Sequence, residues 1–245
     1  MVSKMTRRRT HAERKVQTRS DLVKSARQVF LERGFHGASL DEIAEAAGYS
    51  KGAVYSNFNS KDELFLAVFD AHLVQRTRAL TDIVFSQARL EDAYHAIALS
   101  MSAADVQEPR WTPLLLEFWT YASRHEPLRV IVSQRRERFL DVIAGLIEEL
   151  GRRHGVDFAL PTKEIARGSA ALARGMALER LLNPRAVPAD LFDRVHTAYV
   201  QGLTKTTKDV RSPRKKGRKH EDQQSTITGN QHDRVTVARR RTHRA

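Results

Sequence analysis

The chain has 245 residues, of which 41% are hydrophobic and 29% are charged, and it contains no cysteine. This length allows one large domain or two small ones, and the lack of cysteine excludes disulfide bonds and thiolate metal sites. The sequence contains no run of about 18 apolar residues, so we expect no membrane span. The basic N-terminus lacks the apolar segment of a secretory signal. A reducing compartment fits this composition, and we expect no metal and no cofactor.

The formal net charge of +13 lies mostly at the two ends of the chain. Residues 1–19 hold 7 basic residues and 1 acidic residue, residues 204–245 hold 13 basic and 4 acidic, and residues 20–203 carry a net charge of −2. Like-charged blocks at chain ends are usually disordered and often contact polyanions. We therefore expect a basic disordered arm over 1–18 and a basic disordered tail over 204–245, although such a tail can also serve only solubility.

Residues 19–66 predict three short helices and the start of a longer one. Apolar residues recur at helical spacing over 22–30, and Gly34 follows where a helix C-terminus favours glycine. Ser39 with Glu42 three residues later is a capping-box pattern, which indicates the start of a second helix.

A turn of three residues, Gly48-Tyr49-Ser50, separates that helix from a third helix expected over 51–58. Two short helices joined by such a turn have the geometry of a helix-turn-helix DNA-binding motif. Gly48 would let the chain leave the second helix in a left-handed conformation. Gly52 would let the N-terminus of the third helix approach a surface closely, and a helix N-terminus favours phosphate. Ser60 with Glu63 predicts the start of the fourth helix.

Helical spacing divides the third helix into two sides. Val54 and Phe58 would point inward, and the opposite side would enter the major groove, where Lys51 can donate to guanine. The polar side contains Lys51, Gly52, Tyr55 and Ser56. Tyr55, Asn57 and Lys61 can donate to phosphate or sugar. A plain helical hairpin with a solvated polar face would show the same pattern.

The segment SARQVFLERGFHGASLDEIAEAAGYSKGAVYSNFNSKDELFLAVFD, Ser25–Asp70, resembles the DNA-binding domain of the TetR family of bacterial transcriptional regulators. The match runs through Ser-Leu-x-x-Ile-Ala, the Ala-Gly-x-Ser turn, Gly-Ala-Val-Tyr-x-x-Phe and Ser-Lys-Asp-Glu-Leu-Phe. The resemblance implies DNA contacts at Ser39, Lys51, Gly52, Ala53, Tyr55 and Lys61. The sequence departs from the family at Asn57, where many members have His, and at Tyr49, where a small aliphatic residue is usual.

Beyond residue 66 the pattern remains helical, so we predict an all-α fold. It consists of an N-terminal three-helix helix-turn-helix domain, 19–66, and a helical effector-binding and dimerisation domain, 67–203. The expected helices lie near 62–85, 89–104, 111–124, 128–150, 162–183 and 188–203, with breaks at Pro and Gly.

The second domain resembles the same family more weakly, through WTPLLLEFWTYASRHEPLRVIV from Trp111 and GMALERLLNP from Gly175. The resemblance implies a homodimer through the helices near 162–183 and 188–203. Apolar faces on these helices fit this role, unless they are buried within one subunit; they include Ile165, Ser169, Leu172, Met176 and Leu203. Small residues that would let helices approach closely are Gly168, Ala170, Ala171, Ala173 and Gly175.

An effector would bind in an apolar cavity between these helices. The candidate lining residues are Trp111, Leu115, Phe118, Trp119, Tyr121 and Met176, although aromatic residues at helical spacing are commonly core residues. His95 and Arg138 are the polar residues of interest, with His95 favoured as a hydrogen-bonded core histidine.

The resemblance implies a cytoplasmic, DNA-associated repressor that binds a palindromic operator as a dimer and is released by an unidentified small-molecule effector. The alternative is a sequence-nonspecific architectural DNA-binding protein that depends on its basic arms. Residues 9–19 could also reach the minor groove. We expect no enzyme, because no Gly-rich phosphate loop and no Gly-x-Ser-x-Gly motif occurs, and His125-Glu126 lacks the second His of a zinc helix.

Overall fold

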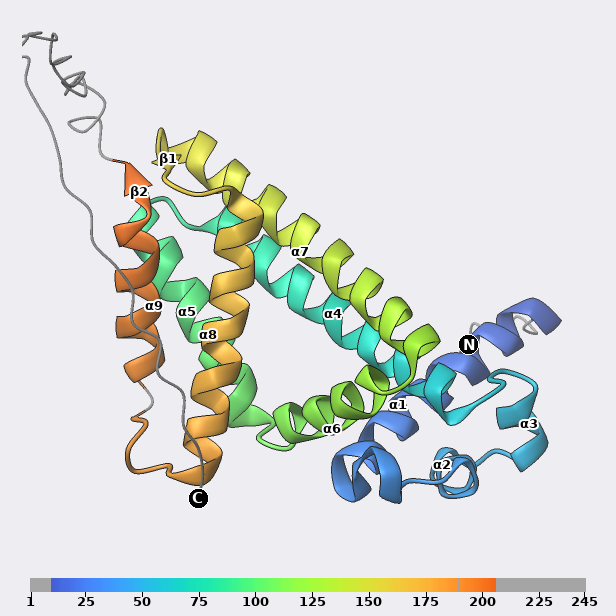
Figure 1. Ribbon diagram of the computed structural model, residues 1–245. Helices are drawn as coiled ribbons and strands as arrows, with labels where there is room; N and C mark the ends of the chain where they lie inside the picture. The colour runs from blue at the N-terminus through green and yellow to red at the C-terminus, as the bar shows by residue number, and fades with distance from the viewer. Residues whose placement is uncertain (1–9, 189, 206–245) are drawn as a thin grey trace, which may run out of the picture. The chain divides into compact units, whose positions relative to one another are not determined.

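The computed structural model describes residues 10–188 and 190–205, without the side chains of 104–106 and 205, and this part of the chain is almost entirely helical (Figure 1). The helices are α1 His11–Gly37, α2 Leu40–Ala47, α3 Lys51–Tyr55, α4 Lys61–Ser86, α5 Leu90–Gln107, α6 Trp111–Ser123, α7 Glu126–His154, α8 Thr162–Leu182 and α9 Leu191–Gly202. The predicted all-α fold is therefore confirmed, and the expected helices of the second domain are present.

The long helix α1 begins earlier than the sequence led us to expect. Thr10 is its N-cap, and the Thr10 hydroxyl and the Glu13 carboxylate form a reciprocal capping box that stabilises the first turn. The expectation of a disordered arm is therefore wrong for residues 11–18, which are helical. Residues 1–9 of that arm lie outside the described residues. Gly34 has a φ of +75°, so the regular helix ends there and a short further turn follows.

The second and third helices form the expected helix-turn-helix. Ser39 and Glu42 make the capping box of α2, and Gly48 ends α2 in the left-handed conformation with φ +70°. The third helix is shorter than the predicted 51–58. The side chains of Ser56 and Asn57 both donate to the carbonyl oxygen of Ala53, and such local hydrogen bonds compete with helix continuation.

Two very short strands follow the long helices. β1 Asp157–Phe158 pairs antiparallel with β2 Thr204–Lys205, and the amide of Ala159 donates to the carbonyl of Leu203 at 2.7 Å. The tail was expected to be disordered from residue 204, and that expectation is wrong for Thr204 and Lys205. These residues continue the chain from α9 and pair with the segment that precedes α8. The rest of the predicted tail, 206–245, lies outside the described residues.

An aromatic cluster joins the N-terminal helices to the second domain. Phe35 at the end of α1 packs against Phe65 of α4 and Phe118 of α6, with ring centroids 5.3 and 5.0 Å away, and Phe65 stacks on Phe118 at 4.1 Å. The carboxylate of Glu117 accepts hydrogen bonds from the amides of Phe35 and His36 at 3.0 and 2.8 Å. Helix α6 therefore both packs against α1 and fixes the backbone that follows Gly34.

The remaining helices enclose a second hydrophobic region. Buried residues of α4, α5, α7 and α9 form a cluster that consists of Val84, Ala93, Tyr94, Leu150 and Val200. In Figure 1, α4 and α7 run side by side, and α5, α8 and α9 lie together away from the N-terminal helices. No helix in the described ranges has the length and apolar character needed to cross a membrane.

Candidate DNA-binding surface and ligand cavity

Helix α3 exposes the polar side predicted from the sequence. Val54 and Phe58 are buried. Val54 anchors α3, and Phe58 anchors the turn that follows α3. Lys51, Gly52, Tyr55 and Ser56 are exposed, with 57% of Tyr55 accessible to solvent. The inward and outward sides of this segment therefore match the sequence-based assignment. The exposed side carries the Lys51 cation at the first residue of α3 and the Tyr55 phenol at its last residue.

Lys51 forms an ion pair across the motif. Its ammonium group lies 2.5 Å from Oδ2 of Asp41 on α2, and both side chains are at least half exposed. The hydrogen bond to Asp41 is the main cause that raises the pKa of Lys51, with the Asp41 charge second. Lys51 is therefore charged, and Asp41 places a negative charge on the surface predicted to meet DNA.

The other predicted DNA contacts have intramolecular partners in this structure. The Ser39 hydroxyl belongs to the α2 capping box, and the Ser56 hydroxyl donates to the backbone of α3. Asn57 is half-buried, and its side-chain amide nitrogen donates to the carbonyl oxygen of Ala53 at 2.8 Å. Lys61 donates to the carbonyl oxygens of His36 and Ala38 at 3.2 and 3.1 Å. These groups hold the motif together here, so their contact with DNA stays a prediction.

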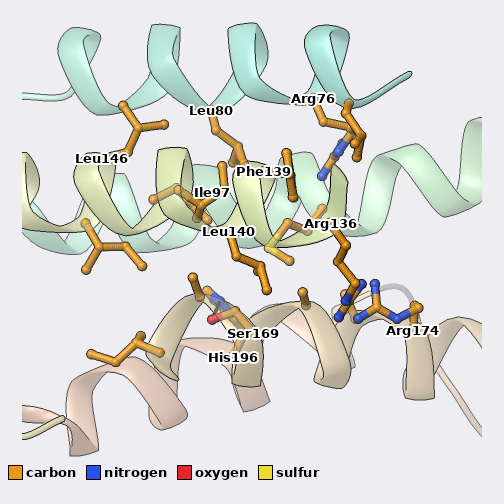
Figure 2. Close-up of a pocket in the computed structure, with 18 of the residues that line it drawn as sticks. Arg76, Leu80, Ile97, Arg136, Phe139, Leu140, Leu146, Ser169, Arg174 and His196 are labelled. Carbon is orange, nitrogen blue, oxygen red and sulfur yellow. Dashed lines mark hydrogen bonds between the residues drawn. The ribbon is translucent and has the colours of Figure 1, made fainter. Parts of the chain in front are cut away.

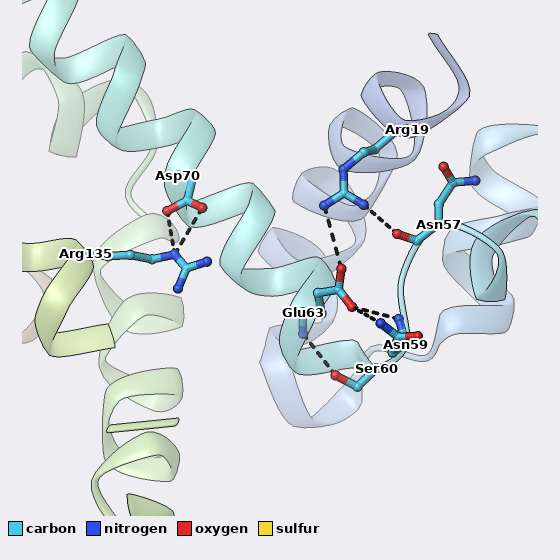
Figure 3. Close-up of polar contacts among 7 residues, drawn as sticks. All are labelled: Arg19, Asn57, Asn59, Ser60, Glu63, Asp70 and Arg135. Carbon is cyan, nitrogen blue, oxygen red and sulfur yellow. Dashed lines mark hydrogen bonds and ion pairs between the residues drawn. The ribbon is translucent and has the colours of Figure 1, made fainter. Parts of the chain in front are cut away.

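Arg19 of α1 fixes the end of α3, which the sequence analysis did not foresee (Figure 3). Its guanidinium donates to the carbonyl oxygen of Asn57 at 2.5 Å and lies 3.8 Å from the carboxylate of Glu63. It also lies 4.0 Å from the ring centroid of Phe58. Glu63 in turn accepts from the backbone and side-chain amides of Asn59. Arg19 therefore stabilises the orientation of α3 from within the protein.

Tyr49 has an internal role as well. Its hydroxyl donates to Asp21 of α1 at 3.0 Å, and Asp21 also accepts from Gln17. The unusual aromatic residue in the turn therefore ties the turn to α1.

A cavity of about 180 Å³ lies among α4, α5, α6, α7, α8 and α9 (Figure 2). Trp111, Leu115 and Trp119 line it, as predicted. Phe118 does not, because it is fully buried in the aromatic cluster on the other side of α6. Met176 is also absent from the lining and is half-buried on α8. Tyr121 instead packs against Phe35, with ring centroids 5.1 Å apart.

The polar residues of this cavity differ from those expected. His95 is an exposed residue whose ring nitrogen lies 2.7 Å from the carboxylate of Asp193, so its assignment as a core histidine is wrong. Arg138 is exposed on α7 and does not line the cavity. The lining instead contains the polar or ionisable side chains of His72, Arg76, Tyr94, Glu108, Thr112, Arg136, Ser169, Arg174 and His196.

Two buried histidines contribute to the cavity wall. Burial lowers the pKa of His72 to about 3, and positive charges on Arg76 and Arg27 act in the same direction. Burial also lowers the pKa of His196 to about 4, against a small opposing effect of Asp193. His196 Nε2 lies 3.1 Å from the hydroxyl of Ser169. Both imidazoles are therefore neutral near pH 7, and the arginines are the cations of the cavity.

The buried and exposed residues of α8 differ from those expected from the sequence. Ile165 and Ser169 are buried and line the cavity, so they are not part of an exposed face. Ala171, Gly175 and Leu182 are exposed at helical spacing on the same helix. Gly168 faces α9, where an added Cβ would lie 2.9 Å from Cζ of Tyr199 and closer still to its hydroxyl oxygen.

Comparisons with known proteins agree with this architecture. Residues 22–68 match the family model for bacterial regulatory proteins of the tetR family, and residues 90–205 match the C-terminal model of the BetI-type transcriptional repressor. The HTH-type transcriptional activator FasR of Mycolicibacterium smegmatis is 44% identical over 82 residues, which cover 32% of this chain and 37% of FasR. The HTH-type transcriptional repressor BepR of Brucella suis is 32% identical over 146 residues, which cover 58% of this chain and 61% of BepR.

A solved structure of a transcriptional regulator from Saccharomonospora viridis, in complex with choline, has the same fold. Its TM-score is 0.63 at 17% identity, and the match covers 78% of this chain and 100% of that chain. The chain spans less than two thirds of the length of the two curated relatives named above. The chain belongs to the TetR family of bacterial transcriptional regulators.

Proposed function

We propose that this protein is a sequence-specific DNA-binding repressor that binds a palindromic operator as a homodimer and is released by a small-molecule effector. The observation that carries the proposal is α3, whose apolar residues are buried while Lys51, Gly52 and Tyr55 are exposed. A helix presented in this way can enter the major groove, where lysine reads guanine and a phenol contacts phosphate or sugar. Ser39, Ala53, Ser56, Asn57 and Lys61 remain the further proposed contacts.

The exposed face of α8 supports the proposed dimer. Ala171 and Gly175 are small enough for close helix approach, and Leu182, with 84% of its surface accessible, is an apolar residue that a partner would cover. The face of α9 that carries Ala198 and Gly202 is exposed as well. A two-fold symmetric pair of recognition helices would require half-sites about one helical turn apart, which is the reason for proposing a palindrome.

The contacts between the cavity and the N-terminal helices support release by an effector. Glu108 lines the cavity and forms an ion pair with Arg27 of α1. Glu117 of α6 holds the end of α1, and α6 also contributes Trp111 and Trp119 to the cavity. A ligand that binds one arrangement of α6 better than another would shift the DNA-binding helices, with a typical coupling of about 1–3 kcal/mol.

The charge distribution favours a second candidate, a sequence-nonspecific architectural DNA-binding protein. Residues 204–245 carry 13 basic and 4 acidic residues, enough for a salt-sensitive attraction to any duplex. Deletion of 206–245 separates the two candidates and keeps β2. A repressor would retain its site preference, whereas an architectural protein would lose binding.

The test is selection of bound duplexes from a random library at about 150–200 mM salt, which suppresses purely electrostatic binding. We expect one palindromic motif. Lys51→Ala should then weaken binding to that motif by about 5- to 100-fold, as loss of a base contact does. Arg89→Ala removes a positive charge just before α5 and should have little effect. Recovery of no motif, with binding lost on deletion of 206–245, would contradict the repressor assignment.

Sedimentation analysis tests the dimer separately. Leu182→Glu would place a carboxylate in the proposed interface and should give monomers at concentrations where the natural sequence is dimeric. Leu160→Glu is a matched control, because Leu160 is also an exposed leucine but lies in the loop before α8. Equal dimer stability for both variants would place the interface elsewhere.

A further inference from the structure

Helix α3 is too short to fix its own direction. It has five residues, and a helix of this length is not stable in water without tertiary contacts. Lys51 and Tyr55, the proposed DNA-contacting side chains, stand at its first and last residues, so a tilt of α3 moves both. Base readout requires donor–acceptor distances of about 2.7–3.2 Å. The contacts that hold α3 therefore affect which bases the protein can distinguish.

Contacts at both ends and in the middle hold α3 in place. Val54 in the middle is fully buried. At the start, Lys51 pairs with Asp41 of α2 at 2.5 Å. Past the end, Arg19 of α1 donates to the carbonyl oxygen of Asn57 at 2.5 Å. A Lys51 side chain that turns to DNA gives up its pair with Asp41, whereas the Arg19 contact remains as a polar link to another helix.

The guanidinium group of Arg19 contacts more than one element. Its carbon lies 4.0 Å from the ring centroid of Phe58, whose side chain is buried. One of its nitrogens lies 3.8 Å from the carboxylate of Glu63, in the first turn of α4. Arginine suits this position because its planar group donates in several directions and packs on aromatic rings. Arg19 thus joins the segment after α3 to the start of α4.

The partners of Arg19 are themselves held (Figure 3). The side-chain amide of Asn57 donates to the carbonyl oxygen of Ala53 within α3. Glu63 accepts from the backbone and side-chain amides of Asn59 at 2.9 and 2.8 Å. The hydroxyl of Ser60 accepts from the Glu63 amide at 3.1 Å. The backbone hydrogen bond from Asn59 lowers the pKa of Glu63, so its carboxylate is charged near pH 7.

We propose that Arg19 is a positioning residue for operator recognition, which holds α3 at the angle that base readout requires without itself contacting DNA. This role rests on the proposed function and deepens it, because it names a residue on which the discrimination between operator and other DNA depends. Loss of Arg19 lowers that discrimination and leaves the electrostatic attraction to phosphates unchanged. Direct binding of a phosphate by the guanidinium group would give the opposite pattern.

The ratio of two affinities measures this discrimination. Dissociation constants of full-length Arg19→Gln are determined for the selected operator and for an unrelated duplex of the same length. We expect the ratio between them to fall by about 5- to 50-fold, as loss of a well-placed base contact does. Partial unfolding would weaken binding to both duplexes by the same factor and leave the ratio unchanged. A ratio equal to that of the natural sequence would overturn the positioning role.

Salt dependence separates positioning from a phosphate contact. Each phosphate contact contributes about 0.9 to the slope of log affinity against log salt concentration. Arg19→Gln should keep the slope of the natural sequence on the operator. A slope smaller by about 0.9, with an equal loss of affinity on both duplexes, would identify Arg19 as a phosphate contact and overturn the positioning role.

Two further variants separate charge from geometry. Arg14→Gln removes a positive charge from an exposed residue of the same helix, so its ratio should equal that of the natural sequence. Arg19→Lys keeps the charge and can donate to Asn57, but it lacks the planar group that also reaches Phe58 and Glu63. Its ratio should therefore recover only in part. An equal fall of the ratio in Arg14→Gln and Arg19→Gln would assign the effect to charge and overturn the positioning role.

Amide hydrogen exchange of the free full-length protein tests the same contact without DNA. The amides of Asn57 and Phe58 donate to the carbonyl oxygen of Val54 at 3.0 and 2.9 Å. Arg19→Gln should speed exchange at these two amides by about 5- to 50-fold and leave exchange within α7 unchanged. Unchanged exchange at Asn57 and Phe58 would overturn the positioning role.

The two readouts distinguish the failure of this role from the failure of the proposed function. Recovery of an operator whose affinity ratio does not change in Arg19→Gln would contradict the positioning role alone. Faster exchange in Arg19→Gln, together with no operator motif for the natural sequence, would contradict the proposed function and leave only the contact between Arg19 and the end of α3.

Discussion

The guanidinium Nε of Arg135 on α7 donates to both carboxylate oxygens of Asp70 on α4, at 2.8 and 3.1 Å (Figure 3). Asp70 lies on the same helix as Glu63, which contacts Arg19 and Asn59 beside α3. Helix α4 therefore carries a contact to the helix-turn-helix at Glu63 and, about two turns later, a contact to the second domain at Asp70. The Arg135–Asp70 pair fixes α4 against α7 at the junction of the two.

A double-mutant cycle measures this pair. Asp70→Asn and Arg135→Gln should each lower the free energy of unfolding, with a coupling of about 0.5–1 kcal/mol, because the pair is only partly buried and solvent reduces its strength. Chemical denaturation at low and high salt gives the coupling, which should shrink as salt increases. Arg138→Gln serves as the control on α7. A coupling of zero at low salt would mean that the pair contributes no stability.

The packing of α8 on α9 predicts the effect of a single methyl group. Gly168→Ala would place a Cβ against the Tyr199 ring, so we expect a loss of about 1–3 kcal/mol of stability from overpacking. Gly145→Ala is the control, because Gly145 is also inside a helix but has open space at its Cβ position. That control should gain roughly 0.5–1 kcal/mol from helix propensity. Thermal unfolding of the two variants should therefore shift in opposite directions.

Tyr199→Phe tests the cause of that loss. It removes the hydroxyl oxygen nearest to the added Cβ but leaves the ring. The destabilisation caused by Gly168→Ala should therefore be smaller in the Tyr199→Phe background than in the natural sequence. An equal loss in both backgrounds would show that the hydroxyl oxygen of Tyr199 is not what limits the space at Gly168.

The buried histidines predict a loss of stability in weak acid. Burial lowers the pKa of His196 to about 4 in the folded protein, from an ordinary value of 6.5. Between these values the unfolded chain binds a proton that the folded protein excludes, so stability falls as the pH decreases from about 6.5 toward 4. His72, with a folded pKa of about 3, acts in the same direction. At pH 5 each histidine should reduce the free energy of unfolding by about 2 kcal/mol relative to pH 8.

Urea unfolding of His196→Leu at pH 8 and pH 5 checks this effect. The variant should lose about 2 kcal/mol less than the natural sequence between the two pH values, whatever its stability at pH 8. His11→Gln, at the exposed start of α1, should leave the difference unchanged. Identical pH dependence of His196→Leu and the natural sequence would exclude His196 as the source.

The sequence was informative wherever local interactions decide the structure. The Ser39 cap, the left-handed Gly48 and the division of α3 between Val54 and Tyr55 depend on neighbours within a few residues, and all are present. The helix α3 was predicted to extend to residue 58 but ends at Tyr55, because the side chains of Ser56 and Asn57 donate hydrogen bonds to the carbonyl oxygen of Ala53. Helix propensity alone does not show which hydrogen-bond partner a side chain such as Ser56 or Asn57 will take.

The cavity could be predicted only in part, because it depends on how distant helices meet. Trp111, Leu115 and Trp119 line the cavity from α6 as the sequence led us to expect, whereas Phe118 and Tyr121 of the same helix were expected there and do not line it. Phe118, the residue directly before Trp119, points to the other side of α6 and packs in the aromatic cluster. Arg136 and Arg174 come together only through the packing of α7 against α8. Helical periodicity gives the faces of one helix but not the register between two.

The ion pair between Lys51 and Asp41 gives a prediction for DNA binding. Asp41 presents a negative charge beside the proposed groove contact, and its carboxylate competes with DNA for the Lys51 ammonium group. Asp41→Asn should therefore tighten operator binding. An exposed pair of this kind contributes about 0.2–1 kcal/mol, so the dissociation constant should fall by roughly 1.5- to 5-fold.

The same substitution should slightly destabilise the free protein. Asp41 lies in the first turn of α2, where a negative charge interacts favourably with the helix dipole by about 0.3–1 kcal/mol. Tighter DNA binding by a less stable protein would thus show that Asp41 opposes DNA binding. Glu45→Gln removes a charge from the exposed side of α2 without touching this pair and is the matched control.

Operator titrations of Asp41→Asn, Lys51→Ala and the double variant at several salt concentrations complete the test. If the effect of Asp41 acts through Lys51, the gain seen in Asp41→Asn should largely disappear in the Lys51→Ala background. A gain that persists in the double variant would mean that Asp41 acts by direct repulsion of phosphate. No change in affinity for Asp41→Asn at any salt concentration would place the DNA contact away from the N-terminus of α3.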